Sequence, residues 1–167
     1  MLCGARSGIS RLVGCPSWDG FADRVLKQLV PGCIDHYELS QINSIKDPKK
    51  RLSIAKIIAK RNKVAIDYGK IFDVTLRPGN IYESLNAFKC TFVTTDYEKK
   101  IAPNSRRADR EDQWRFFRRD QLLGSKLDVN GNVIHLHGCS DAPESMIITT
   151  KDYLEHYSSR EVQDFLR

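Results

Sequence analysis

Two histidines close a short apolar run, Val133-Ile134-His135-Leu136-His137-Gly138. The β-branched pair at its start predicts a strand, and Asn130-Gly131 just upstream predicts a hairpin turn. Ligands of open α/β sheets gather at the carboxyl ends of the strands, so His137 is expected at the rim of a crevice, where Gly138 would let a ligand approach the backbone. An imidazole there suits a general base. For an arbitrary His-x-His pair the commoner alternative is two packed, hydrogen-bonded histidines.

Two acidic side chains follow a second apolar run. Residues 90–94, Cys-Thr-Phe-Val-Thr, are short and apolar enough for a central strand. Asp96 and Glu98 come directly after it, at another carboxyl end where a ligand-facing group is expected. The sequence therefore offers a pair of carboxylates and an imidazole as the candidates for chemistry at one edge of a sheet.

A glycine-rich turn that carries Gly4, Gly8 and Ser10 lies near the N-terminus. Backbone N–H groups of such a turn can bind phosphate, but short glycine clusters also form ordinary loops, which is the favoured interpretation of the turn alone. Only a few strand-like residues precede it, whereas strands usually have ~5 to 6 residues. We therefore expect the chain to begin inside an element.

Length and composition predict one globular domain over residues 1–167. The chain is 41% hydrophobic and 29% charged, as in soluble proteins. Its five cysteines are odd in number and widely spaced, which predicts neither a disulfide framework nor a Cys-x-x-Cys zinc site. We found no apolar run that could span a bilayer and no secretory signal, so a cytoplasmic location without a membrane partner is expected.

The formal charge of +6 favours an anionic partner, from a dinucleotide to a nucleic acid. The basic residues are dispersed, however, so most are expected on solvated helix faces and loops, and nucleic-acid binding is disfavoured. Residues 113–119, Gln-Trp-Arg-Phe-Phe-Arg-Arg, could stack bases, but helix packing with snorkelling arginines is the favoured interpretation.

The elements that must position these residues are predicted to be mostly helices in the N-terminal half. One begins after Ser17 and stops at Pro31-Gly32, two cover 37–45 and 67–72, and another starts at Asp47-Pro48. Asn80 with Glu83 predicts a capping box for a further helix. The apolar residues expected on the inner faces of these helices are Phe21, Val25, Leu26, Leu29, Leu52, Ala55, Ile58, Ala59, Ile81, Leu85 and Phe88.

In the C-terminal half, residues 99–112 are polar and are predicted to form a long loop or lid. Residues 145–148 predict another short strand. Thr149 or Thr150 is expected to cap a helix through Tyr153 and Leu154, and Ser158 with Glu161 to cap the last one.

Taken in order, four motifs resemble the sirtuin-like domain family, in particular its zinc-less branch that consumes NAD in bacterial anti-phage defence. The residues that carry the resemblance are Gly4-Ala5 with Gly8-Ile9-Ser10, then Gly14-Cys15-Pro16-Ser17-Trp18, Thr94-Thr95-Asp96-Tyr97-Glu98, and Val133 to Ser140 with the segment from Ser145 to Tyr153 after it.

The resemblance implies a Rossmann-like open parallel sheet with flanking helices, and hydrolysis or transfer at the N-glycosidic bond of NAD. NAD would be the substrate, with no zinc. His137 would be the base, Asp96 would orient the nicotinamide, and His135 would be structural. The residues expected around the cofactor are Gly4, Ala5, Gly8, Ile9, Ser10, Pro16, Trp18, Thr94, Thr95, Tyr97, Glu98, Gly138 and Ser140.

Three departures from the family pattern leave a second interpretation open. Arg6-Ser7 lengthens the glycine loop, Asp96 stands where the family has asparagine, and Glu98 stands where it has aspartate. A module that binds NAD or ADP-ribose as a sensor, without turning it over, is the alternative to a glycohydrolase. The first strand is shorter than in the family and later strands are missing, so we expect a fold incomplete at both ends that pairs with further domains of a longer chain or with a second copy.

Overall fold

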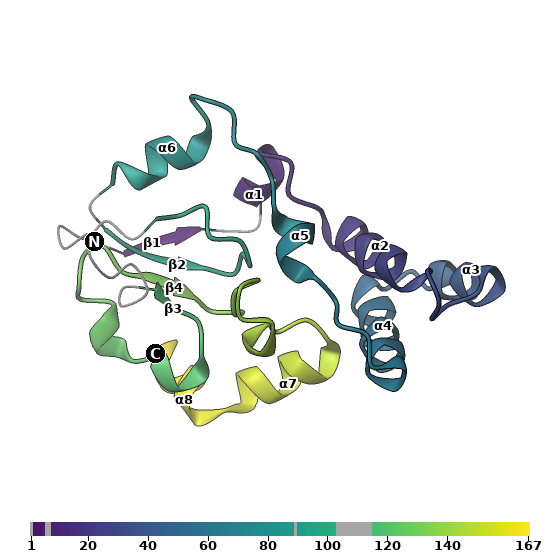
Figure 1. Ribbon diagram of the computed structural model, residues 1–167. Helices are drawn as coiled ribbons and strands as arrows, with labels where there is room; N and C mark the ends of the chain where they lie inside the picture. The colour runs from purple at the N-terminus through teal and green to yellow at the C-terminus, as the bar shows by residue number, and fades with distance from the viewer. Residues whose placement is uncertain (1, 6–7, 89, 103–114) are drawn as a thin grey trace.

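The computed structural model describes residues 2–5, 8–88, 90–102 and 115–167, and it is an α/β structure with a parallel sheet at its centre (Figure 1). The strands are β1 (Leu2–Ala5), β2 (Thr91–Thr94), β3 (Arg115–Phe116) and β4 (Val133–His135). Their spatial order is β1-β2-β4-β3, and each neighbouring pair is parallel. All four carboxyl ends therefore meet at one edge, as a Rossmann-like sheet requires.

Alternate residues of the strands face opposite layers. Phe92 and Val133 are paired in register and pack with Tyr82, whereas Val93 and Ile134, one residue on, pack with Val162 and its neighbours. The first layer contains α1 (Gly8–Leu12) and α6 (Ile81–Asn86), and the second contains α8 (Arg160–Phe165). β2 and β4 are largely buried on both faces and consequently read as continuous apolar runs in the sequence.

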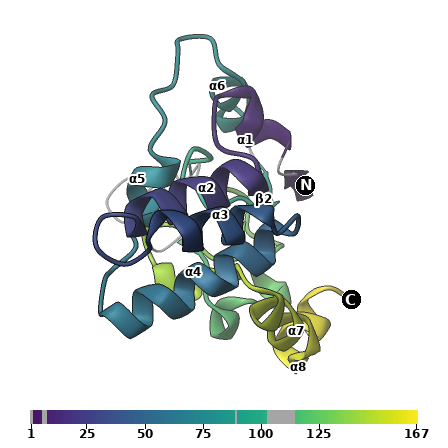
Figure 2. The ribbon, with the colours of Figure 1, turned by 90° about the vertical axis from the view of Figure 1, so that its right-hand side faces the viewer.

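A group of helices stands beyond the carboxyl ends of the strands (Figures 1 and 2). It consists of α2 (Trp18–Leu29), α3 (His36–Ser44), α4 (Pro48–Asn62) and α5 (Tyr68–Phe72), with α7 (Thr150–Ser158) at its lower side in Figure 1. The predicted inner faces of α2 and α4 are correct, because Val25, Leu29 and Ala55 have no exposed surface. This helical group forms one wall of the space in front of the sheet edge.

A buried arginine joins α2 to α4. Arg51 is 6% exposed, and its guanidinium bonds to the carboxylates of Asp19 at 2.5 Å and Asp23 at 2.6 Å. Both aspartates are at least half exposed, so the pair keeps part of its hydration while the arginine stem packs between the helices. Arg51 thus links α2 to α4 by charge-assisted hydrogen bonds to two different carboxylates, in addition to the apolar packing between the helices.

Three expectations for the C-terminal half were wrong. Residues 145–148 form no strand: Ser145 ends the 3-10 helix η4 (Pro143–Ser145), and the N–H groups of Met146 and Ile147 bond to the Pro143 and His137 carbonyls instead of forming a ladder. The turn at 130–131 leads into β4 without a hairpin, since β3 and β4 are parallel. Arg115–Phe116 is a strand and not part of a helix, because β4 supplies its backbone partners; residues 113–114 lie outside the described part.

Two helix details also differ from expectation. The last helix is capped by Ser159 and not by Ser158, since the Ser159 hydroxyl accepts the Val162 N–H at 3.4 Å. Asn80 caps α6, but the predicted capping box with Glu83 is wrong, because Asn80 Oδ1 accepts the Tyr82 N–H at 2.9 Å and Glu83 accepts the Gly79 N–H at 3.0 Å. Tyr82 is the buried residue of α6, whereas Ile81 and Phe88 are 38% and 53% exposed. The predicted loop or lid at 99–112 lies largely outside the described residues.

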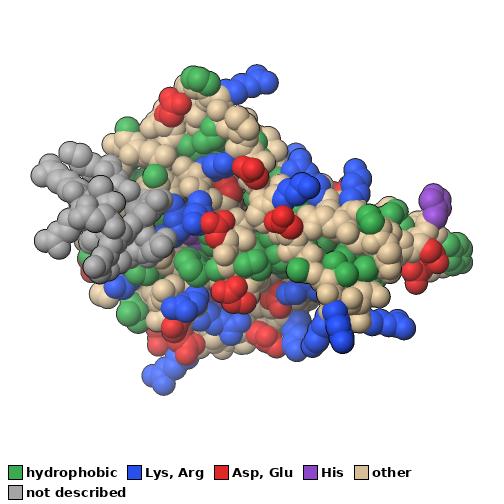
Figure 3. Space-filling model, viewed as in Figure 1, with side chains coloured by type: hydrophobic (Ala, Val, Ile, Leu, Met, Phe, Trp, Pro, Cys, Tyr) green, Lys and Arg blue, Asp and Glu red, His purple; other side chains and the backbone are tan. Residues whose placement is uncertain are grey.

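The visible surface mixes both signs of charge. Lysine and arginine alternate with acidic side chains over the face shown in Figure 3, with small apolar areas between them. Within the described ranges, none of the helices has the length and apolarity needed to cross a bilayer.

Candidate functional site

A cavity of about 300 Å³ lies at the carboxyl ends of β2 and β4. Its size is at the lower end of the range for small-molecule sites. Segments far apart in sequence build it: α1, the start of α2, α5, the segment after β2, the residue after Leu136 and α7. The described lining residues are Ser10, Arg11, Cys15, Pro16, Ser17, Trp18, Phe21, Phe72, Thr95, Asp96, Tyr97, Glu98, His137 and Tyr153.

The cavity brings together eight of the residues that the sequence singled out: Ser10, Pro16, Trp18, Thr95, Asp96, Tyr97, Glu98 and His137. Five others do not line it: Gly8, Ile9, Thr94, Gly138 and Ser140. Gly4 and Ala5 belong to β1, where they pair with Val93 and Thr94, and their side chains lie outside the description.

The residues that do not line the cavity have visible structural tasks. Thr94 Oγ1 accepts the Asp96 N–H at 3.0 Å and so shapes the turn after β2. Ser140 donates its N–H to the Tyr97 carbonyl at 2.8 Å, and Ile9 packs against the cluster around Tyr82. Gly138 has a positive φ of 84°, and the space beside its Cα is filled by the Ser145–Met146 backbone rather than by the cavity.

Asp96 is a buried carboxyl beside a buried hydroxyl. It is 6% exposed, and so is Ser10, which lines the same cavity. Burial raises the pKa of Asp96 above its ordinary value, while hydrogen bonding to the Ser10 and Thr94 side chains acts in the opposite direction. The two polar side chains therefore meet at the cavity, where a ligand can also contact them.

Glu98 is a second buried carboxyl with a raised pKa. Tyr82 donates its hydroxyl to Glu98 Oε1 at 2.5 Å, and the carboxyl is 4% exposed. Burial, followed by the charge of Asp96, raises the pKa of Glu98 to about 7. Two neighbouring acids in low dielectric disfavour double ionisation, so one of them tends to hold a proton.

Glu98→Gln should therefore stabilise the protein more as pH rises. The pKa of Glu98 increases from 4.5 to about 7 on folding, so its contribution to the free energy of unfolding declines over that pH interval. Because glutamine cannot ionise and still accepts from Tyr82, the variant should gain up to about 3 kcal/mol over the wild type between the two ends of the interval. Urea denaturation at several pH values measures the difference. Glu161→Gln, at an exposed site on α8, should show no such trend.

His137 follows Leu136 at the end of β4 and is 8% exposed. Its Nε2 lies 2.6 Å from the Tyr157 hydroxyl, and its Nδ1 lies 3.3 Å from the Tyr153 hydroxyl. Burial, then the charges of His156 and Lys49, lower the pKa of His137 to about 4. The imidazole is consequently neutral at pH 7 and keeps a lone pair with which to accept a proton.

His135 has a different environment, although it is only two residues away. It is fully buried, and its Nε2 accepts from Arg115 at 2.7 Å while its Nδ1–H donates to the Asp96 carbonyl at 2.9 Å. An arginine can only donate, which fixes this tautomer. His135 thus ties β3 and β4 to the turn that carries Asp96, and it holds that backbone in place.

Aromatic rings form the wall of the cavity opposite the sheet. Trp18 and Phe21 of α2 contact Tyr97, with ring centroids 6.1 and 6.0 Å apart, and Trp18 also contacts Tyr153 at 6.3 Å. Lys49 lies over the Tyr153 ring, 3.7 Å from its centroid. Flat apolar walls with a few polar groups suit a planar heteroaromatic ligand.

Sequence reasoning missed several residues of the site. Arg11 is the one cation among the described lining residues, Tyr82 holds Glu98, and Tyr153 and Tyr157 hold His137. The two tyrosines on α7 are four residues apart and therefore share one helix face, a signal that the sequence does contain. No group of three or more metal-binding side chains occurs in the described ranges.

Comparison with known proteins agrees with this geometry. The model of the family described as SIR2-like domain matches residues 91–167, which includes β2, Asp96, His137 and α7. A search of curated proteins finds no match. SIR2-like domains use NAD, so this match indicates an NAD-related function for the matched part. Residues 91–167 are thus similar to the SIR2-like, that is sirtuin-like, domain family.

Proposed function

We propose that the protein is a glycohydrolase that converts NAD to nicotinamide and ADP-ribose. One observation supports this most. Asp96 and His137 are far apart in the sequence, yet they line the same aromatic-walled cavity. Ser10 adds a buried hydroxyl to this cavity, beside Asp96. Imidazole, carboxyl and hydroxyl are the groups needed to orient a nicotinamide riboside and to activate a water.

The reaction breaks the bond between C1′ of the ribose and the nicotinamide nitrogen. The transition state has oxocarbenium character, as in other glycoside cleavages. Water adds to C1′, nicotinamide leaves with the bonding electron pair, and the neutral His137 accepts the proton that the water loses. Asp96 would hold the carboxamide, the aromatic wall would exclude bulk water, and Arg11 would meet the pyrophosphate charge.

We further propose a place in the zinc-less bacterial defence branch of the family, as the sequence motifs suggested. The described cysteines are compatible with this choice: Cys15, Cys33 and Cys139 are free thiols, and burial raises the pKa of Cys15 to about 11, which keeps it protonated and unreactive. Free thiols fit a reducing, cytoplasmic setting.

The test is direct. Purified protein is incubated with NAD, and free nicotinamide and ADP-ribose are quantified over time by chromatography. Release of both products in equal amounts is the expected result. Saturable binding of NAD in calorimetry with no nicotinamide released would contradict hydrolysis and support the second candidate, a module that senses NAD or ADP-ribose.

Asp96 motivates the second candidate, and Asp96→Asn distinguishes the two. A carboxylate cannot donate to the nicotinamide carbonyl, whereas a neutral carboxyl or an amide can. We expect Asp96→Asn to raise nicotinamide release about 10- to 100-fold at pH 8.

The same substitution should weaken the pH dependence. Because burial raises the pKa of Asp96, acidification populates its neutral, donating form, so wild-type activity should increase as the pH falls and the variant should change less. Loss of activity in Asp96→Asn at every pH would mean that the negative charge itself is required, as a stabiliser of the oxocarbenium ion.

A further inference from the structure

Two tyrosines of α7 contact His137 from different sides. Tyr153 and Tyr157 are four residues apart, and their rings are stacked with centroids 6.1 Å apart. The Tyr157 hydroxyl is 2.6 Å from Nε2, whereas the Tyr153 hydroxyl is 3.3 Å from Nδ1. One ring nitrogen is therefore held closely and the other loosely.

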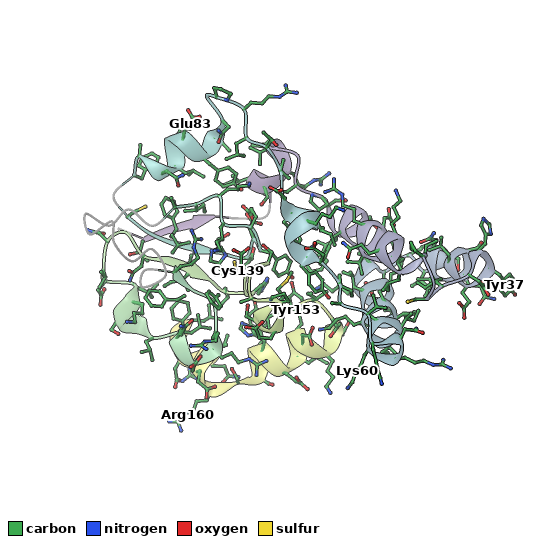
Figure 4. The ribbon with its side chains drawn as sticks, in the orientation of Figure 1. Tyr37, Lys60, Glu83, Cys139, Tyr153 and Arg160 are labelled. Carbon is green, nitrogen blue, oxygen red and sulfur yellow. The ribbon has the colours of Figure 1, made fainter. Side chains whose placement is uncertain are left out.

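The two contacts lie on different sides of the histidine. Tyr153 lines both the candidate cavity and a broad neighbouring hollow, whereas Tyr157 lines only the hollow, together with Lys49 and Gln163, and is 38% exposed. Figure 4 shows Tyr153 rising from α7 toward the strand ends. Nδ1 is thus the nitrogen on the substrate side, and Nε2 is the nitrogen on the outer side.

We propose that Tyr157 is a positioning residue for His137, which accepts the Nε2–H and leaves the Nδ1 lone pair directed at the substrate. This inference rests on the proposed hydrolysis, because it assigns the base its reacting atom. Tyr157 can serve as acceptor because it lines the open hollow, where its own O–H can donate to water. Before substrate binds, the Tyr153 O–H donates to Nδ1, and a substrate hydroxyl or the attacking water then replaces this longer bond.

The arrangement follows the logic of a base oriented by a third group. An acceptor on Nε2–H fixes the tautomer and stabilises the imidazolium that forms when Nδ1 takes up a proton. The other ionisable groups near the ring are His156 on α7 and Lys49 on α4, and both disfavour a positive charge on His137. The Tyr157 oxygen is the neighbour that favours that charge.

The experiment uses Tyr157→Phe, which removes the hydroxyl and keeps the ring. Nitrogen-15 imidazole spectra, assigned with a His137→Gln variant, should show His137 as the Nε2–H tautomer in the wild type and as a mixture in Tyr157→Phe. Tyr153→Phe should keep the wild-type tautomer. The kcat for nicotinamide release should fall about 10- to 100-fold in Tyr157→Phe, less than for loss of a base, with the KM for NAD changed less than about threefold, since Tyr157 does not line the cavity.

Tyr37→Phe on α3 is the matched control, because Tyr37 is 70% exposed and lies at the outer end of the helical group (Figure 4). It should behave as the wild type. An unchanged tautomer together with an unchanged kcat in Tyr157→Phe would overturn the proposal. If the wild type released no nicotinamide, hydrolysis would fail, and the imidazole spectra would still decide the role of Tyr157.

Discussion

His137→Ala should lower the rate of nicotinamide release from NAD about 100- to 10,000-fold, the range expected for removal of a general base. The physical reason is that burial keeps the His137 imidazole neutral at pH 7, so its lone pair is available to take the proton that the attacking water loses. Glu98, whose pKa is raised to about 7, is the competing base at the same cavity, whereas Asp96 is assigned to the carboxamide. Initial rates of nicotinamide formation at saturating NAD measure the effect.

Two further variants keep this prediction interpretable. The alanine variant leaves the hydroxyls of Tyr153 and Tyr157 without their histidine partner. His137→Gln is therefore measured beside it, because glutamine can hydrogen-bond to a tyrosine but accepts no proton at neutral pH. His36→Ala is the matched control, because His36 is an exposed histidine at the start of α3. Equal turnover by the wild type and both His137 variants would remove His137 from the mechanism.

The sequence predicted the strand ends better than their surroundings. The apolar runs before Asp96 and His137 are β2 and β4, because strands buried on both faces leave an unambiguous signal. Ser17, Asp47, Asn80 and Thr149 cap helices as expected, since a cap depends on a few local hydrogen bonds. The parallel sheet then determines that the two strand ends share an edge.

Features that depend on long-range packing could not be predicted. The strand Arg115–Phe116 has two residues and exists because β4 is its partner. His135 and His137 have different roles because Arg115 bonds to His135, whereas Tyr157 of α7 bonds to His137. Both partners lie outside the His-x-His motif in the sequence. The aromatic wall likewise depends on how α2 packs in front of the strand ends, which the sequence does not determine locally.

Gly138→Ala should destabilise the fold by more than about 4 kcal/mol, at the extreme of single substitutions. A methyl group at this position would lie 2.2 Å from the Ser145 carbonyl oxygen and 2.7 Å from the Met146 nitrogen, both backbone atoms that no side-chain rotation can move. The φ of 84° adds strain for any residue with a Cβ. Since small domains are stable by only about 5 to 15 kcal/mol, the variant should be largely unfolded or insoluble.

Two other glycines separate the sources of this cost. Gly79 has a φ of 73° but nothing within 4 Å of a new Cβ, so Gly79→Ala should show the backbone strain alone, about 1 to 2 kcal/mol. Gly124 has neither a positive φ nor a close neighbour, so Gly124→Ala should be near neutral. Urea denaturation of the three variants measures the series. A Gly138→Ala protein as stable as Gly79→Ala would show that the 145–146 segment can yield, and the glycine beside His137 would then have to be explained by a ligand that approaches its backbone.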